Sequence, residues 1–127
     1  MKRVFLAYLP AVAWAAFVLV VGGLPAVRAP SFFDFPGADK VAHFGLYGVL
    51  GALLLVGRHL ARSRHPGAWP LLVVAIMAAG DEARQGAVPG RSPEVTDWVT
   101  DVLGAGAGFL VAGTLLRSKE RGRRDES

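Results

Sequence analysis

The chain has 127 residues, enough for one domain, and no cysteine, which excludes disulfides, thiolate metal ligands and cysteine nucleophiles. Hydrophobic residues make up 53% of the sequence and charged residues 19%, with a mean hydropathy of +0.41. This balance is typical of a small helical membrane protein. The net charge of +4 comes from short basic clusters between apolar runs, a distribution that indicates membrane topology and argues against nucleic-acid binding.

The first apolar run, residues 4–24, has the length of about 20 residues that a helix needs to cross the hydrocarbon core. Pro10 is expected to kink this helix without breaking it. A cleaved signal peptide is the alternative, but the run is longer than the usual apolar region of roughly 7–15 residues. Residues 25–38, rich in proline, glycine and phenylalanine, are predicted to form a connector.

The second apolar run, residues 41–57, follows Asp39 and Lys40 and carries His43 and Tyr47 in its first two turns. Asp39 is predicted to cap the helix start, because a carboxylate can accept a hydrogen bond from the free N–H groups there. Lys40 is expected to extend toward the lipid headgroups.

The third apolar run, residues 68–80, gives only about 20 Å of helix against roughly 30 Å of hydrocarbon. The helix is therefore predicted to continue through Gln85, which brings Glu82 and Gln85 to one face at i,i+3. A re-entrant segment is the alternative. A turn is predicted over residues 89–93.

The fourth run, residues 98–116, begins after Asp97, a predicted helix cap, and contains Asp101 one turn further in. Gly104 and Gly108 form a face of small residues suited to close helix packing. Residues 117–127 are charged and are predicted to be a disordered tail.

The basic residues predict how the chain is oriented. With four spans, one side of the membrane carries Lys2, Arg3, Arg58, Arg62, Arg64, Arg117, Lys119, Arg121, Arg123 and Arg124. The other side carries only Arg28, Lys40, Arg84 and Arg91. The positive-inside rule places both termini in the cytoplasm. The expected fold class is all-α: a small polytopic membrane protein with four transmembrane helices in one domain, residues 1–116, and a cytoplasmic tail, residues 117–127. A soluble all-α bundle is the alternative.

Polar residues concentrate on the extracytoplasmic side of this topology, where ionisable groups usually face the bundle interior. Helical spacing puts one stripe of them on the second helix and another on the fourth, so His43 is expected beside Glu82 or Asp101, with an arginine offsetting the acids. The candidate binding residues are Asp39, Lys40, His43, Tyr47, Glu82, Arg84, Gln85, Arg91, Asp97 and Asp101. Bracing of the helices is the alternative role for the same cluster, with Glu82 and Gln85 pairing with Arg91.

No cofactor or metal is expected. A histidine with several carboxylates suits a divalent ion, but the sequence has no paired-histidine motif and no dense acidic loop. It also has no glycine-rich phosphate loop, and its serines have no nucleophile-elbow context.

The ordered set Asp39-Lys40-x-x-His43-Phe44-x-x-Tyr47, Glu82-x-x-Gln85, Pro89-Gly90-Arg91-Ser92 and Asp97-x-x-x-Asp101-x-x-Gly104-x-x-x-Gly108 resembles the VanZ-like family of bacterial membrane proteins. The family usually has Asn where this chain has Asp101. The resemblance implies a helical integral protein of the bacterial cytoplasmic membrane. The founding member of the family is linked to low-level resistance to the glycopeptide teicoplanin.

Three functions remain open. The first is a module whose outward polar site binds a membrane lipid, a lipid-linked or cell-envelope headgroup, or a glycopeptide. The second is an enzyme that acts on such a lipid with His43 or Glu82 as general acid or base. The third is a structural protein whose polar cluster only braces the helices. A transporter is disfavoured, because four spans without an internal repeat leave little room for alternating access.

Overall fold

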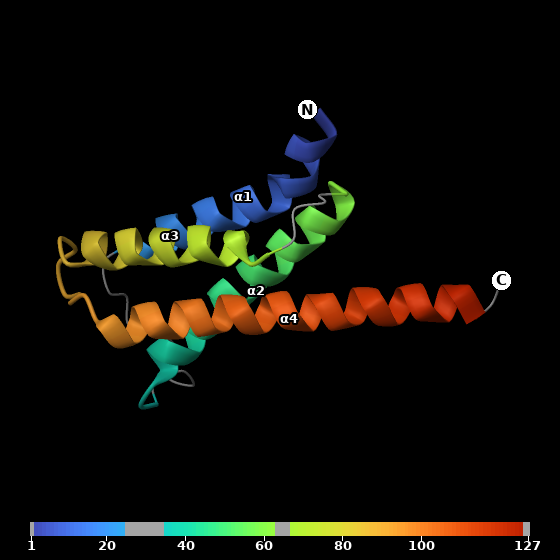
Figure 1. The fold of residues 1–127 in the computed structure, drawn as a ribbon. Helices are drawn as coiled ribbons and strands as arrows, with labels where there is room; N and C mark the ends of the chain where they lie inside the picture. The colour runs from blue at the N-terminus through green and yellow to red at the C-terminus, as the bar shows by residue number, and fades with distance from the viewer. Residues whose placement is uncertain (1, 25–34, 63–66, 126–127) are drawn as a thin grey trace.

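The computed structural model describes residues 2–24, 35–62 and 67–125. The described residues form four helices and no strand, which confirms the all-α class (Figure 1). The helices are α1 (Lys2–Gly22), α2 (Ala38–Leu60), α3 (Trp69–Gln85) and α4 (Val95–Asp125). By length and composition, α1, α2 and α4 could each cross a membrane. Most of the predicted connector, together with Arg28 and Arg64, lies outside the described residues.

The third helix continues beyond its apolar run, as predicted, and ends at Gln85. Its 17 residues rise about 25 Å, somewhat less than the hydrocarbon thickness. The predicted turn follows it: the N–H of Arg91 donates to the carbonyl of Val88 at 3.1 Å, and Gly90 has a φ of 79°. Proline followed by a glycine at positive φ is the signature of a type II turn, so the sequence Pro89-Gly90 reverses the chain between α3 and α4.

The fourth helix is longer than expected. Residues 117–127 were predicted to be disordered, but α4 continues through the charged segment to Asp125. Only Gly122 disfavours helix there, and Glu120 stands four residues before Arg124, a spacing at which opposite charges support a helix. An established helix also adds residues at little cost, because nucleation has already been achieved.

The second and fourth helices pack through glycines. A Cβ atom on Gly108 would overlap the carbonyl oxygen of Gly48, and one on Gly104 would overlap the carbonyl oxygen of Phe44. On the opposite helix, a Cβ atom on Gly51 would overlap the carbonyl oxygen of Ala105. The predicted small-residue face at Gly104 and Gly108 is therefore confirmed as the surface on which the two backbones meet.

The core is small and lies where α1, α2, α3 and α4 converge. Its buried residues are Ala11, Val18, Tyr47, Leu50, Val74, Ala78 and Ala105. Large apolar side chains such as Phe5, Ile76 and Leu110 point outward instead, each about two-thirds exposed. Such an exterior suits hydrocarbon better than water. Two tryptophans tie the helices together: Trp14 Nε1 donates to the carbonyl of Leu46, and Trp98 Nε1 donates to that of Ala75.

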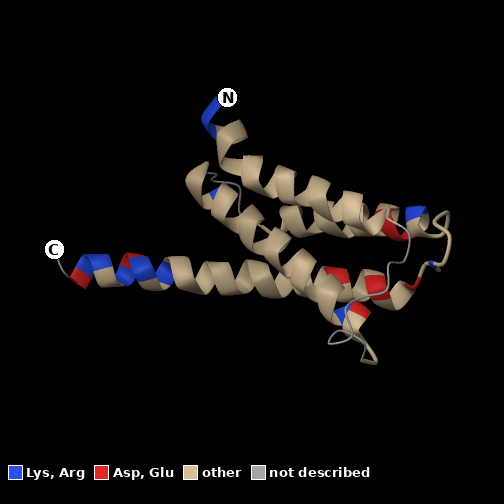
Figure 2. Ribbon diagram, turned by 180° about the vertical axis from the view of Figure 1, so that it is seen from behind, with Lys and Arg blue, Asp and Glu red and all other residues tan. Residues whose placement is uncertain are grey.

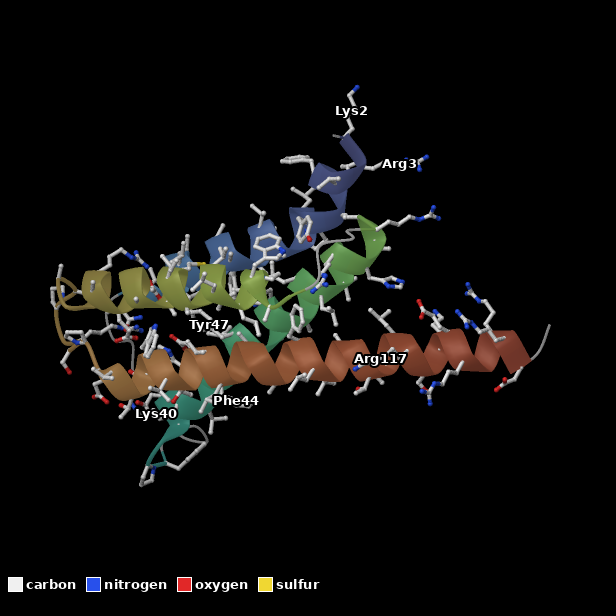
Figure 3. All side chains as sticks on the ribbon, viewed as in Figure 1. Lys2, Arg3, Lys40, Phe44, Tyr47 and Arg117 are labelled. Carbon is white, nitrogen blue, oxygen red and sulfur yellow. The ribbon has the colours of Figure 1, made fainter. Side chains whose placement is uncertain are left out.

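The charged residues separate toward the two ends of the bundle (Figure 2). Acidic residues gather where α3 ends and α4 begins, whereas the beginning of α1 and the end of α4 are basic. Figure 3 shows Lys40 beside the first turns of α4, with Lys2 and Arg3 toward the opposite end. The acidic end, which we call the polar end, contains nearly all of the candidate site residues.

Candidate functional site

A cavity of about 380 Å³ opens at the polar end of the bundle. It lies between the end of α1, the beginning of α2, the end of α3 and the loop that leads into α4. The lining includes six of the predicted site residues: Asp39, His43, Tyr47, Gln85, Arg91 and Asp97. Val18, Val21 and Leu46 give it an apolar wall. The faces of α2 and α4 that helical periodicity predicted to be polar thus contribute to one cavity.

Lys40 links α2 to the beginning of α4. Its Nζ donates to Asp39 Oδ2 at 3.1 Å, to Glu94 Oε2 at 2.9 Å and to Asp97 Oδ1. The expected extension toward headgroups is therefore not the arrangement seen, because three carboxylates surround this one ammonium group. Its charge offsets those acids where the two helices meet.

The two predicted helix caps are wrong. Gly37, with a φ of 85°, occupies the N-cap position of α2, so Asp39 lies inside the first turn and makes no side-chain cap. The last helix begins at Val95, which places Asp97 inside its first turn as well. Both carboxylates still lie near the positive end of a helix dipole, where negative charge is stabilised. The side chain of Lys40 pairs with both of them.

His43, which is partly buried, and the buried Asp101 form the central pair of the site. The distance from His43 Nδ1 to Asp101 Oδ1 is 2.8 Å, and Asp101 is fully buried in α4. The expectation that His43 lies beside Asp101 is thus confirmed. An ionised Asp101 can only accept, so Nδ1 donates the shared proton, and in the neutral imidazole Nε2 keeps its lone pair.

The end of α3 contributes a second buried polar group. Glu82 and Gln85 are both buried, on the one face that their spacing predicted. Glu82 Oε2 accepts the backbone N–H of Glu94 at 3.0 Å, and Gln85 Nε2 donates to Asp81 Oδ2 at 3.2 Å. The expected pairing of Glu82 and Gln85 with Arg91 does not occur. Glu82 instead fastens the end of α3 to the loop that precedes α4, through the backbone of Glu94.

Arg84 does not offset Glu82 either. Its guanidinium donates to Asp81 Oδ1 at 2.6 Å and to the carbonyl of Leu19, which ties α3 to the end of α1. Sequence reasoning left Asp81 out of the candidate set, although its spacing to Arg84 (i,i+3) and to Gln85 (i,i+4) was a usable signal. Glu94 was missed as well, because nothing local to it predicts a contact with α2.

Several buried polar atoms in this region lack a partner among the described residues. They are the hydroxyl of Tyr47, Glu82 Oε1 and Asp101 Oδ2. Buried polar groups in folded proteins are nearly always hydrogen-bonded, and each unsatisfied one is costly. A water, a further polar group or an ion could satisfy these three atoms, which lie in one polar region.

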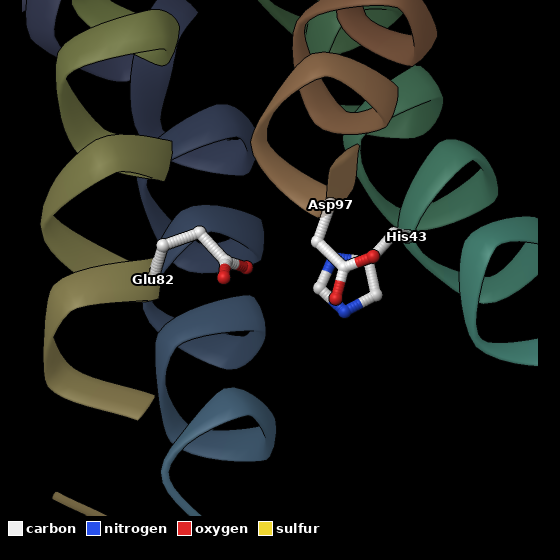
Figure 4. A group of neighbouring side chains, drawn as sticks. All are labelled: His43, Glu82 and Asp97. Carbon is white, nitrogen blue, oxygen red and sulfur yellow. The ribbon is translucent and has the colours of Figure 1, made fainter. Parts of the chain in front are cut away.

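Three side chains here have the chemistry and spacing of metal ligands. One ring nitrogen of His43 and one carboxylate oxygen each of Glu82 and Asp97 lie within 4.8 Å of one another (Figure 4). No metal motif is visible in the sequence because each of the three residues comes from a different helix. A spacing pattern within one helix cannot detect a group whose members lie on three different helices.

The comparisons with known proteins identify the family of the chain. No curated protein and no solved structure matches the chain. The family model VanZ/LLP1 matches residues 5–116, which include all but the first residue of the four apolar runs and every candidate site residue. With its membrane-spanning helices and its polar end built from the motifs quoted above, the chain is a membrane protein of the VanZ/LLP1 family.

Proposed function

We propose that the chain crosses the bacterial cytoplasmic membrane four times, with both termini in the cytoplasm and the cavity on the extracytoplasmic side. The direction of the helices supports this topology. Because α2 and α4 both run from the polar end to the basic end, the chain must return between them, and α3 is the described helix on that path. The basic end would face the cytoplasm by the positive-inside rule.

We infer that the cavity binds the polar headgroup of a lipid-linked or cell-envelope molecule. The observation that carries this proposal is a polar cavity between helices that otherwise face lipid, with the hydroxyl of Tyr47 on its wall unpartnered among the described residues. The guanidinium of Arg91 lines the cavity without a side-chain partner among the described residues. It is therefore available to a phosphate, while Gln85 and Ser92 could hydrogen-bond a sugar or peptide. The apolar wall would accept the beginning of the lipid chain.

The test uses the purified full chain in detergent. Mass spectrometry identifies lipids that copurify from bacterial membranes, and titration with a polyprenyl phosphate and a polyprenyl diphosphate sugar gives the affinity for each. Arg91→Gln removes the charged hydrogen bond between the guanidinium and the headgroup. Its loss should weaken the binding free energy by about 1.5–3 kcal/mol and raise Kd roughly 10–100-fold. Arg123→Gln, at the basic end, is the matched control and should leave Kd unchanged. Equal affinities for all three proteins, or no lipid retained, contradict the proposal.

A second candidate function, acid–base catalysis on such a lipid, is favoured by the pairing of His43 with Asp101. A carboxylate that orients an imidazole leaves Nε2 able to accept a proton from a reacting group. The test is turnover of a lipid that the protein retains, followed by product analysis. Loss of product with His43→Ala and Glu82→Gln, while the lipid is still bound, supports catalysis. Full binding with no product from the unaltered chain favours the binding role.

Glycopeptide resistance would be a consequence of headgroup binding if the bound molecule were the antibiotic's target or the antibiotic itself. The cell-level measurement is the teicoplanin concentration that stops growth of a susceptible strain expressing the chain. Expression of the unaltered chain should raise that concentration, and Arg91→Gln should not. Equal values with and without expression separate this chain's role from resistance and leave the binding test to decide the function.

A further inference from the structure

The three metal-ligand residues meet at the centre of the polar end. His43 comes from α2, Glu82 from α3 and Asp97 from α4. Figure 4 shows the Glu82 carboxylate directed across the gap toward His43 and Asp97. Their nearest ligand atoms are within 4.8 Å of one another, which is close enough for one ion to contact all three after small side-chain movements.

The unpartnered atoms give an independent reason to expect a cation there. Glu82 is 6% exposed, and its Oε1 has no hydrogen-bond partner although Oε2 is satisfied by Glu94. A buried carboxylate oxygen is costly unless a donor or a cation neutralises it. The hydroxyl of Tyr47, on the cavity wall, is also unpartnered and could hydrogen-bond a water held by such an ion.

The His43–Asp101 contact has the form that metal sites use. A ligating histidine commonly donates its second ring N–H to a carboxylate, which fixes the tautomer and the orientation of the ring. With Nδ1 engaged by Asp101 at 2.8 Å, Nε2 is the nitrogen that remains for an ion. Asp101 would thus be a positioning residue. The usual asparagine of the family would not supply the same negative charge.

The charges around this point also favour a cation. Lys40 is shared among Asp39, Glu94 and Asp97, and Arg84 is engaged by Asp81. The remaining buried carboxylates, Glu82 and Asp101, face the histidine alone at close range. Lys40 approaches Asp97 through Oδ1, which leaves Oδ2 for an ion.

We propose that His43, Glu82 and Asp97 bind one divalent cation. Asp101 would orient the ring of His43, and the site would be open toward the cavity. One imidazole nitrogen and two carboxylate oxygens suit Zn²⁺ or Mn²⁺. This proposal adds a metal ion to the proposed headgroup site. Only the role of the ion depends on that proposed function. An ion at this position would give an acid-rich cavity a site for an anionic oxygen, such as that of a phosphate headgroup. Its remaining coordination positions would face the cavity because His43 and Asp97 line it.

The experiment measures metal binding by the full chain, purified with a tag that contains no histidine and stripped of metal with a chelator. Titration with MnCl₂ is followed by electron paramagnetic resonance of free Mn²⁺, and Zn²⁺ is added as a competitor. We expect one saturable Mn²⁺ site per chain, displaced by Zn²⁺. His43→Ala and Glu82→Gln should each weaken it at least tenfold, and Asp101→Asn roughly 10–100-fold. His59→Ala, at the basic end, is the control and should bind like the unaltered chain.

A second measurement does not depend on how well those variants fold. The chain has three histidines, so His59→Ala combined with His65→Ala leaves His43 alone. Pulsed electron paramagnetic resonance of bound Mn²⁺ should then detect one directly coordinated imidazole nitrogen. Absence of that signal, or no saturable binding of either ion, overturns the metal site. The lipid titration, repeated with and without a chelator, separates the two proposals: lipid binding that is unaffected by chelation keeps the headgroup site and removes the ion.

Discussion

Replacing Gly108 with alanine tests whether the glycine contact between α2 and α4 holds the bundle together. The new methyl group would occupy the position of the Gly48 carbonyl oxygen, which belongs to a helix backbone and cannot rotate away. The two helices must therefore separate at this point. Gly106 offers a matched control on the same helix, because a Cβ atom there meets nothing within 4 Å.

The expected effect can be worked from these contacts. Overpacking a well-packed contact costs about 1–3 kcal/mol, and a gap of only about 0.5–1 Å loses roughly a quarter to a half of the dispersion energy of the facing atoms. Alanine also favours helix over glycine by up to about 1 kcal/mol. That gain is common to both variants and cancels between them. Gly108→Ala should therefore be less stable than Gly106→Ala by about 2 kcal/mol or more.

The assay is unfolding of the purified chain in mixed micelles, titrated with a denaturing detergent and followed by tryptophan fluorescence. The free energy of unfolding is compared between Gly106→Ala and Gly108→Ala under identical conditions. Gly45→Ala and Gly51→Ala repeat the contrast on α2, since Gly45 is open and Gly51 meets a backbone carbonyl. Equal stabilities within each pair would refute the account of helix packing given above.

Other contacts give further expectations. The hydrogen bond from Lys40 holds the pKa of Glu94 below its usual range, so its stabilising effect is present above the unfolded-state pKa and is lost as the pH falls through the folded-state pKa. The melting temperature of the unaltered chain should therefore fall more in acid than that of Glu94→Gln. Trp98→Phe removes the donor to the Ala75 carbonyl and should cost about 1 kcal/mol in the same unfolding assay. Trp69→Phe, about half exposed, should change stability little, and equal losses from both tryptophans would contradict this assignment.

Features that depend on one helix at a time were predictable from the sequence. The apolar runs located all four helices. The shortness of the third run correctly predicted that α3 continues to Gln85. Helical spacing placed His43 on the face that meets Asp101, and the spacing of Gly104 and Gly108 identified the surface against α2. In each case the period of the helix alone decides which side chains share a face.

Features that depend on how separate helices are placed were not predictable. Asp97 looked like a cap because Thr96 and Trp98 flank it, but the helix begins two residues earlier and its carboxylate meets Lys40. Arg84 pairs with Asp81 inside α3, but its second contact, with the carbonyl of Leu19, depends on where α1 lies. Relative rotation and depth of the helices set these partners, and a single sequence carries no direct signal for either.

The shortness of α3 has a consequence for the surrounding lipid. Its apolar part, before Asp81, is shorter than the hydrocarbon layer, so a crossing at this point would require the bilayer to become thinner beside it. Thinning costs a fraction of a kcal/mol per ångström, which a small bundle can sustain. The headgroups of the leaflet nearest the polar end would then lie lower next to the cavity. A lipid approaching from that side would reach the buried carboxylates with less of its headgroup hydration removed.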